Sequence, residues 1–355
     1  MNILVTGANG FIGRHLCAVL AEVGCAVTAV SRSAWEPPPG RRITAATLRR
    51  IRGMVVPELA PETDFGPLLA GQEAVVHLAG RAHVLHDDAA DPRREFQRVN
   101  VDLSVALAEA AIEAGVKRFL YVSSIGVLGN RTTGAPFDRN SPAAPLEAYA
   151  ASKLEAERRL RELFKGSGVE NSKLRRGVDG DTERRGAAIL NFPHPTPPPT
   201  LIVVRPPLVY GPGAKGNFER LMTLVDRVPV LPFGAIHARR SYVHVLNLCS
   251  FLYTCLRHET ASGTYAVCDG EDLPLNELLR IIAAEMRKTC WLLPVPTVAL
   301  RLLGRVVGRR AELDRLTSEL LIDNRDERRQ TGWQPAHSPR DGLRAMVREF
   351  RREAA

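Results

Sequence analysis

Short apolar runs recur along the N-terminal part of this chain and alternate with amphipathic stretches. The runs are Ile3–Thr6, Val27–Val30, Met54–Val56, Ala74–Leu78, Arg118–Val122 and Leu201–Val204. Between the first two, apolar residues take the i, i+3, i+4, i+7 spacing of one helix face: Leu16, Val19, Leu20 and Val23. A second helical pattern covers Val101–Ala114. Because strands that alternate with helices form parallel sheets covered on both faces, the pattern predicts an α/β fold with a doubly wound parallel sheet.

The pattern changes after about Gly213, where short strands and Leu-rich helices take over. The clearest helical stretches are Leu275–Met286 and Val298–Leu316. We therefore expect a dinucleotide-binding domain over residues 1–212. A smaller C-terminal substrate-binding lobe, interleaved with the last strands of the sheet, is expected over residues 213–355.

Two segments fit this pattern poorly. Trp35–Arg52 is rich in Pro, Gly and Arg, so we expect an irregular excursion before the third strand. Residues 166–200 combine glycines, charges of both signs and a proline-rich run with little apolar periodicity. Such a segment buries too little surface to offset its ordering entropy, which predicts a mobile surface insertion. A proline-rich docking segment or lid is the alternative.

Composition narrows the class of protein. The 355 residues are 45% hydrophobic and 25% charged, as in soluble globular proteins. Met1 is followed at once by a strand pattern and no apolar stretch could span a bilayer, so we expect a cytoplasmic protein without membrane insertion. The net charge of +9 comes from arginines spread along the chain, not from one nucleic-acid-binding stripe. The six cysteines lack C-x-x-C spacing, which argues against a disulfide framework.

The first strand leads directly into a glycine-rich turn. Thr6-Gly-Ala-Asn-Gly-Phe-Ile-Gly13 places glycines at positions 7, 10 and 13, just before the helical pattern. Gly7 allows a tight turn, Gly10 lets the main chain approach phosphates, and Gly13 lets the helix pack close to the sheet. In a β-α-β context these features indicate a Rossmann-type fold that binds a pyrophosphate at the helix N-terminus.

Tyr149 and Lys153 supply the second chemical signal. They stand at i and i+4, so one helix face carries a phenol and an ammonium. An ammonium within about 4–6 Å lowers a phenol pKa by roughly 1–3 units, which would make Tyr149 a usable acid–base. Ser124 follows the fifth strand and could hydrogen-bond a substrate oxygen. Taken alone, the Tyr–Lys pair could also be an ordinary surface pair.

Five motifs in order carry a family resemblance. They are the glycine turn, Val122-Ser-Ser124, Tyr149-x-x-x-Lys153, Arg205–Pro212 and Arg240-Ser-Tyr-Val-His244. With them the chain resembles the extended short-chain dehydrogenase/reductase family, NAD-dependent epimerase/dehydratase branch, over nearly its full length. The runs His77–His86, Pro207–Phe218 and Asp269–Leu273 look most like bacterial UDP-sugar 4-ketoreductases. Those that make UDP-N-acetylquinovosamine for surface polysaccharide are the nearest likeness.

The resemblance implies roles for individual residues. Ser124, Tyr149 and Lys153 would be catalytic, and Tyr149 and Lys153 would also contact the cofactor. The other implied cofactor contacts are Gly7, Gly10, Phe11, Ile12, Gly13, Ser31, Arg32, Leu78, Ala79, Gly80 and Asn100. Related 4,6-dehydratases carry an Asp-Glu pair directly after the catalytic Ser or Thr, where this chain has Ile125 and Gly126. Without carboxylates for elimination, dehydration is disfavoured.

Cofactor choice depends on the end of the second strand. An NAD site has Asp or Glu there to accept from the ribose 2′-OH, whereas an NADP site supplies an Arg. This chain reads Val30-Ser-Arg-Ser33, which favours NADP(H) with Arg32 at the 2′-phosphate and leaves NAD(H) as the alternative. Arg32 could also be a solvated loop residue. Glu58 stands where many relatives have an Asp beside the adenine.

The resemblance also implies a nucleotide-sugar substrate. Arg240 aligns with the family arginine that holds the diphosphate, and a guanidinium fork suits that role. Arg205, Asn217 and Phe218 are the other candidate substrate residues, with packing as the alternative role for Phe218. The run His83–Asp88 has His and Asp side chains but no third ligand cluster, so we expect no metal site. We expect no nucleic-acid partner, and a homodimer remains an open alternative to a monomer.

Three functions are compatible with these residues. A nucleotide-sugar 4-ketoreductase, most closely one that reduces a UDP-4-keto-6-deoxy-hexosamine, exchanges its cofactor at each turnover. A UDP-sugar 4-epimerase keeps NAD bound and returns the hydride to the other face of the keto intermediate. A non-enzymatic dinucleotide sensor needs no Tyr-x-x-x-Lys pair, which this chain retains.

Overall fold

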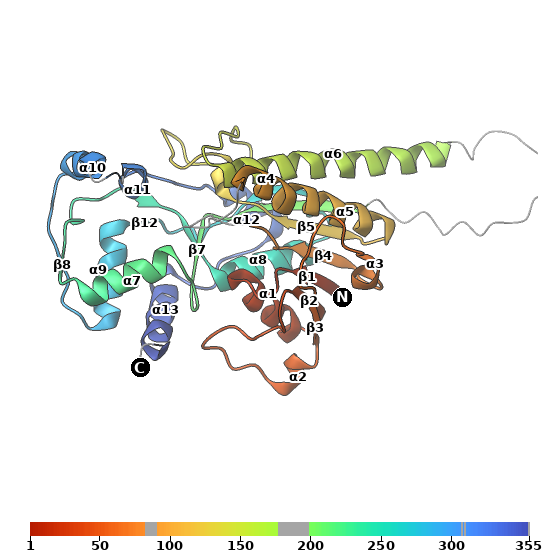
Figure 1. The fold of residues 1–355 in the computed structure, drawn as a ribbon, viewed down its shortest axis with the longest axis horizontal. Helices are drawn as coiled ribbons and strands as arrows, with labels where there is room; N and C mark the ends of the chain where they lie inside the picture. The colour runs from red at the N-terminus through yellow and green to blue at the C-terminus, as the bar shows by residue number, and fades with distance from the viewer. Residues whose placement is uncertain (82–90, 177–198, 307, 309, 354–355) are drawn as a thin grey trace, which may run out of the picture.

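The computed structural model describes residues 1–81, 91–176, 199–306, 308 and 310–353. Its central sheet has seven parallel strands in the order β11-β6-β5-β4-β1-β2-β3 (Figure 1). The strands are β1 (Asn2–Thr6), β2 (Ala26–Ser31), β3 (Ile51–Val55), β4 (Ala74–His77), β5 (Arg118–Val122), β6 (Thr200–Arg205) and β11 (Gly263–Ala266). The strand order reverses beside β1, as in doubly wound folds. The predicted Rossmann-type α/β fold is confirmed.

Helices flank this sheet on both sides. Those in the first part of the chain are α1 (Phe11–Glu22), α2 (Ala45–Leu48), α3 (Gly66–Leu69), α4 (Pro92–Phe96), the π-helix η1 (Gln97–Asp102), α5 (Leu103–Glu113), the 3₁₀ turn η2 (Ile125–Val127) and α6 (Ala148–Arg176). After β6 come α7 (Asn217–Arg227), α8 (Val245–Arg257), α9 (Leu275–Met286), α10 (Thr297–Val306), α11 (Arg310–Leu316), α12 (Arg325–Thr331) and α13 (Pro339–Glu353).

The C-terminal half of the chain builds a smaller lobe beside the sheet, seen at the left of Figure 1. Three two-stranded sheets belong to it: β7 (Leu208–Tyr210) with β10 (Tyr242–His244), β8 (Val230–Leu231) with β13 (Trp291–Leu292), and β9 (Arg239–Arg240) with β12 (Leu273–Pro274). Helices α7, α9 and α13 pack around a separate apolar core in this lobe. Strand β11 returns from this half of the chain to form one edge of the central sheet.

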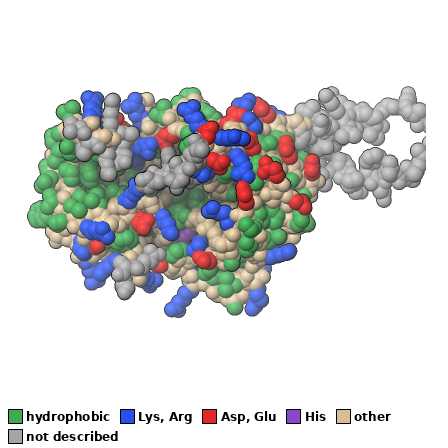
Figure 2. Space-filling model, viewed as in Figure 1, with side chains coloured by type: hydrophobic (Ala, Val, Ile, Leu, Met, Phe, Trp, Pro, Cys, Tyr) green, Lys and Arg blue, Asp and Glu red, His purple; other side chains and the backbone are tan. Residues whose placement is uncertain are grey.

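Charges of both signs are mixed on the surface. On the face seen in Figure 2, Lys and Arg side chains stand among Asp and Glu side chains instead of forming one stripe. Among the described residues, no helix is long and apolar enough to cross a membrane. All six cysteines are free thiols.

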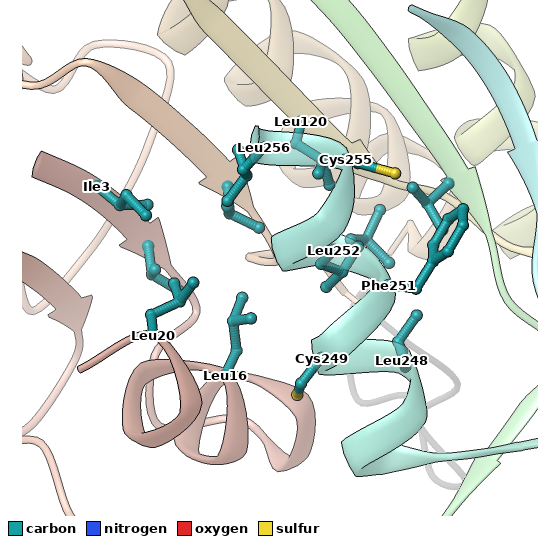
Figure 3. Packing of buried hydrophobic residues seen from close by; sticks show 14 of the residues in the cluster. Ile3, Leu16, Leu20, Leu120, Leu248, Cys249, Phe251, Leu252, Cys255 and Leu256 are labelled. Carbon is teal, nitrogen blue, oxygen red and sulfur yellow. The ribbon is translucent and has the colours of Figure 1, made fainter. Parts of the chain in front are cut away.

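Successive side chains of each strand point to opposite faces of the sheet, and an apolar layer covers each face. Ile3 and Val5 point to the face that α1 and α8 cover, whereas Leu4 points to the face that α5 and α6 cover. Figure 3 shows the first layer, where side chains of α1 and α8 such as Leu16 and Leu252 meet those of the strands. Each fully buried Leu of this kind contributes about 1.5–3 kcal/mol to folding. Burial on both faces explains why the strands read as continuous apolar runs.

Four details differ from the sequence-based predictions. Val23 does not join the buried face of α1, because the helix ends at Glu22 and Val23 is its exposed C-cap. The helix predicted over Val298–Leu316 is two helices, α10 and α11, and Gly308 between them has a left-handed φ of 71°. The excursion over Trp35–Arg52 contains the short helix α2 and the start of β3. Helix α6 runs to Arg176, well into the predicted insertion, whereas residues 177–198 lie outside the described residues.

Candidate active site

The glycine turn between β1 and α1 is built from close backbone contacts. Gly7 has a φ of 68°, and a Cβ there would lie 2.7 Å from the amide nitrogen of Ala79. A Cβ on Gly13 would lie 2.2 Å from the carbonyl oxygen of Gly7. These contacts give Gly7 and Gly13 the turn and packing roles that the sequence predicted.

The start of α1 suits an anion. Gly10 is exposed and is the N-cap of the helix, and no side chain caps it. The first turn, which includes Phe11 and Ile12, carries no acidic residue. Main-chain N–H groups at such a helix start lack intrahelical partners and favour negative charge. The turn therefore fits the pyrophosphate of a dinucleotide.

Lys153 lies buried on α6 beneath the loop that follows β4. Its Nζ donates to the carbonyl oxygen of Val122 at 3.1 Å and lies 4.7 Å from the ring centre of Tyr121. A Cβ on Gly80 would lie 3.2 Å from this Nζ, so the loop backbone approaches the ammonium closely. Burial lowers the pKa of Lys153 to about 8, although the charge of Glu157 opposes this. The ammonium is held in one place at the carboxyl edge of the sheet.

Tyr149 lies one helical turn before Lys153, and its ring centre is 6.3 Å from that of Phe96. Burial raises the pKa of Tyr149 to about 12. The sequence predicted the opposite direction, with Lys153 lowering this pKa, and that prediction is wrong for the protein alone. The reason is that burial removes the phenol from water, which disfavours its charged form.

The two serines after β5 differ in access. Ser123 is buried, and its main-chain N–H donates to the carbonyl oxygen of Val204 at 2.8 Å. Ser124 is only partly buried and caps η2, because its Oγ accepts from the N–H of Gly126 at 3.1 Å. Its hydroxyl hydrogen remains free to turn toward a ligand. This geometry fits the choice of Ser124 over Ser123 as the catalytic serine.

Asn100, a predicted cofactor contact, supports the loop that follows β4. It is fully buried on the π-helix η1, and its Oδ1 accepts from the N–H of Arg81 at 2.7 Å. Its Nδ2 donates to the carbonyl oxygen of Arg81 at 3.0 Å and to Ser152 Oγ at 2.9 Å. Both amide donors are thus used within the protein. The side chain fixes the loop Leu78–Arg81 beside Lys153.

His77 also helps to hold the loop that follows β4. The sequence analysis gave it no role beyond its place in a motif. Its Nδ1 is 2.7 Å from Thr6 Oγ1 and its Nε2 is 3.0 Å from Ser104 Oγ. Thr6 Oγ1 also accepts from the N–H of Ala79 at 3.2 Å. Burial, and secondly the Lys153 charge, lower the pKa of His77 to about 3. A neutral imidazole therefore ties β1, β4 and α5 together below the same loop.

The residues at the end of β2 are exposed to solvent, in contrast to the buried residues around Lys153. Arg32 is exposed directly after the strand, and Ser31 Oγ donates to the carbonyl oxygen of Ser33 at 2.8 Å. Asn9 of the glycine turn fixes the following loop, because its Nδ2 donates to the carbonyl oxygen of Ala34 at 2.7 Å and its Oδ1 accepts from the N–H of Glu36 at 2.9 Å.

Two carboxylates in the loops that follow β2 and β3 form ion pairs. Glu36 lies 2.7 Å from Arg14, and Glu58 lies 2.7 Å from Arg98. Arg32 forms no ion pair with another described residue. The end of β2 therefore carries a positive charge without a free carboxylate.

Arg240 reaches the start of α6 through a short chain of contacts. Its Nη1 donates to the carbonyl oxygens of Arg315 at 2.8 Å and Ser318 at 3.0 Å. Arg315 in turn pairs with Glu147, two residues before Tyr149. Burial, and then the neighbouring charge of Arg315, lower the pKa of Arg240. No carboxylate in the described ranges forms an ion pair with Arg240, so its charge is available for an anionic ligand.

Sequence reasoning missed Glu147 and Arg315, since nothing in their local sequence marks this long-range pair. Asn217 is exposed at the first turn of α7, where a ligand could reach it.

Two predicted substrate residues are buried and pack inside the protein. Arg205 is buried, and its Nε and Nη2 donate to the two carboxylate oxygens of Glu157 at 3.0 and 2.6 Å. This buried ion pair gives Arg205 a structural role, and its binding of substrate stays a prediction. Phe218 is also buried, with its ring 5.6 Å from that of Tyr210 and 5.9 Å from that of Tyr242. It packs the core of the smaller lobe, which was the alternative role.

Among the described residues, no group of His, Cys, Asp or Glu side chains is placed to hold a metal ion. The run His83–Asp88 lies outside the described residues.

Comparison with known proteins gives this site a family. Residues 3–175 match the model of the NAD dependent epimerase/dehydratase family. A UDP-glucose 4-epimerase of Vibrio cholerae is 33% identical over 353 residues, which cover 98% of this chain and 95% of that protein. This chain belongs to the NAD-dependent epimerase/dehydratase family. It is therefore an enzyme of the extended short-chain dehydrogenase/reductase type, and the non-enzymatic alternative falls away.

Other members of the family are more distant. A GDP-6-deoxy-D-mannose reductase of Pseudomonas aeruginosa is 27% identical over 364 residues, covering 98% of this chain and 96% of that protein. The crystal structure of a UDP-glucuronic acid 4-epimerase from Bacillus cereus in complex with NAD superposes with a TM-score of 0.72, at 19% identity and full coverage of both chains. At that identity the likeness shows the fold alone.

Proposed function

We propose that this enzyme uses NADP(H) to reduce the 4-keto group of a UDP-4-keto-6-deoxy-hexosamine. The observation that carries the proposal is the end of β2, where Arg32 is exposed and Glu36 and Glu58 are paired with arginines. A 2′-phosphate would meet an unpaired guanidinium there, whereas the sequence Ser31-Arg-Ser33 offers no Asp or Glu at the end of β2 to accept from a 2′-OH. NADPH is a reductant that is exchanged at each turnover, as a reductase requires.

The residues at the other end of the site suit ketone reduction. When bound, the cofactor supplies a hydride to the carbonyl carbon. Tyr149, with its pKa raised to about 12, is fully protonated at neutral pH and can give its phenolic proton to the carbonyl oxygen. Ser124 donates a hydrogen bond to that oxygen and fixes its distance from Tyr149. The Lys153 ammonium, one turn along α6, stabilises the phenolate that remains.

Arg240 supports a diphosphate-containing substrate. Its guanidinium is held by two carbonyl oxygens at the end of α11 and linked through Arg315 and Glu147 to the start of α6. A cation held in this way meets an anion without first breaking an ion pair, which suits bidentate binding of phosphate oxygens. The exposed Asn217 is our candidate for a further nucleotide contact.

A UDP-sugar 4-epimerase is the second candidate, and the 33% identical Vibrio cholerae protein of that name favours it. The same Tyr149, Ser124 and Lys153 would then first remove and later return a proton at the C4 oxygen. The two reactions differ in their cofactor balance, because an epimerase consumes none. They also differ at the first step, where an epimerase needs the phenolate and a reductase needs the phenol.

Reaction stoichiometry tests the proposal. With a UDP-4-keto-6-deoxy-hexosamine and NADPH, the absorbance of the reduced nicotinamide should fall one-for-one with the product formed. The same assay with NADH should run more slowly. Interconversion of UDP-glucose with its C4 epimer, without net consumption of either cofactor, would establish the epimerase instead.

A further inference from the structure

The outward face of α10 is apolar, which is unusual for a surface helix. Leu300 and Gly304 are buried toward the lobe core. Val298 and Leu302, one turn apart on the opposite side, are 66% and 54% exposed. A surface helix normally places polar residues where these two stand. The helix therefore has apolar residues on its inner and its outer face.

The exposed apolar surface continues onto the neighbouring strands. Trp291 of β13 is 67% exposed and is paired in register with Val230 of β8, which is exposed as well. Leu293 follows β13, is also exposed, and lies four residues before α10. Figure 2 shows apolar side chains gathered over this end of the smaller lobe, where β8 and α10 stand in Figure 1. We call Val230, Trp291, Leu293, Val298, Leu302 and Leu303 the α10 surface.

Single exposed apolar residues are common and need no explanation, but a contiguous group marks an interaction site. Trp291 is the most informative member. Burial of a large aromatic side chain is strongly favourable, and a largely exposed Trp forgoes most of that stabilisation. Since the group lies at the far end of the smaller lobe from the central sheet, it is separate from the candidate active site (Figure 1).

The segment that carries most of the α10 surface has an excess of positive charge. Residues 286–306 contain four Lys or Arg and no Asp or Glu: Arg287, Lys288, Arg301 and Arg305. Two of these cations form ion pairs, Lys288 with Asp226 at 3.1 Å and Arg301 with Asp314 at 3.7 Å. Arg305 is exposed on α10, three residues after Leu302 and thus on the same side of the helix. Lys and Arg side chains also border the apolar area in Figure 2.

We propose that the α10 surface docks this enzyme onto an anionic phospholipid bilayer. A helix with exposed aliphatic residues flanked by arginines lies in the plane of the lipid interface, with its apolar face at the acyl boundary. Trp is enriched at that depth, and each Lys or Arg near an anionic leaflet adds electrostatic attraction. The enzyme lies on the membrane and does not span it. This inference does not depend on the substrate or the cofactor preference.

Charge complementarity favours a bilayer over a second copy of this chain. Two α10 surfaces that faced each other would bring the excess positive charge of both copies together, which is unfavourable. An anionic leaflet offers negative charge on all sides of the patch together with an apolar interior.

Co-sedimentation with vesicles tests the proposal on the full chain. The protein is mixed with vesicles of phosphatidylglycerol and phosphatidylcholine, or of phosphatidylcholine alone, at low and at moderate salt. We expect binding to the anionic vesicles that weakens as salt rises. Leu302→Glu should weaken it about tenfold or more, because it places a carboxylate in the apolar face. Arg305→Glu should weaken it less and remove part of the salt dependence.

Leu48→Glu is the matched control. Leu48 is also a half-exposed helical leucine, but it lies on α2 of the other domain, so this variant should bind vesicles like the wild type. None of these positions belongs to the candidate active site, so equal catalytic activity shows that each variant is folded. Equal binding to neutral and anionic vesicles, or equal binding of the Leu302→Glu and Leu48→Glu variants, would overturn the proposal. So would self-association that Leu302→Glu abolishes in a protein that does not bind vesicles.

Discussion

The two ends of the proposed cofactor site are built in opposite ways. At one end His77, Asn100 and Lys153 are buried, and each is held by hydrogen bonds to other parts of the sheet edge. At the other end Arg32 and Ser33 are exposed in a loop that Asn9 holds from the side. The buried end fixes the positions of reacting groups, whereas the exposed end can change its residues without disturbing the core.

This difference sets the scale of the effects that substitutions should have. When a substitution removes the partner of a buried polar group, that group stays out of water without a hydrogen bond, which destabilises the protein. An exposed polar group that loses its partner forms hydrogen bonds with water instead. Substitutions at the buried end should therefore affect chemistry and stability strongly. Substitutions at the exposed end should mainly change which cofactor is preferred.

Tyr149→Phe gives the largest expected effect. The ring keeps its contact with Phe96 but cannot donate a proton, so turnover should fall by roughly 10²–10⁴-fold while cofactor affinity stays nearly unchanged. Steady-state kinetics and a cofactor binding titration measure the two quantities separately. Wild-type turnover in this variant would remove Tyr149 from the chemistry.

Arg205→Ala tests the buried ion pair behind the site. It leaves Glu157 buried with only Arg161 as a cation, which should lower the free energy of unfolding by about 3–5 kcal/mol. Urea denaturation measures it. Arg158→Ala is the matched control, because Arg158 pairs with Glu155 and Glu162 on the exposed side of the same helix and such pairs contribute little. Equal stabilities of the two variants would show that Arg205 is free to bind ligands after all.

Lys153 should give cofactor binding a pH dependence. Since burial lowers its pKa to about 8, the ammonium loses its proton above that pH, whereas an ordinary lysine stays charged past pH 10. The dissociation constant of NADPH should be constant below pH 7.5 or so and rise by up to about tenfold per unit above pH 8. In Lys153→Arg the side chain stays charged, so the constant should stay flat over the same range. A flat wild-type profile would contradict the lowered pKa.

Arg32→Ala should have the smallest effect and the most specific one. The loss of a charge-assisted contact to the 2′-phosphate should reduce the preference for NADPH over NADH by about 1–3 kcal/mol. Arg52→Ala, at an exposed position in the neighbouring strand β3, is the control and should leave the preference unchanged. The ratio of kcat/KM values for the two cofactors is the readout. An unchanged ratio in Arg32→Ala would mean that Arg32 is only a solvated loop residue.

Local sequence patterns predicted the fold well. Strand runs such as Arg118–Val122 and the turn at Gly7 depend on neighbours in the chain, so a single sequence reveals them. The partner of Arg205 is 48 residues away on another element, and no local signal separates a paired arginine from a free one. The upward pKa shift of Tyr149 could not be predicted from the sequence either, because desolvation depends on the packing around the side chain.

The most direct test of an exchangeable cofactor is an assay without any added cofactor. Purified enzyme is incubated with UDP-N-acetylglucosamine alone, and then with a UDP-4-keto-6-deoxy-hexosamine before and after addition of NADPH. We expect no C4 epimer from the first substrate, and reduction of the second only after NADPH is added, in equal amount to the NADPH consumed. Formation of the C4 epimer without added nucleotide would show that NAD stays bound through the reaction, which would contradict a reductase that takes its preference from Arg32.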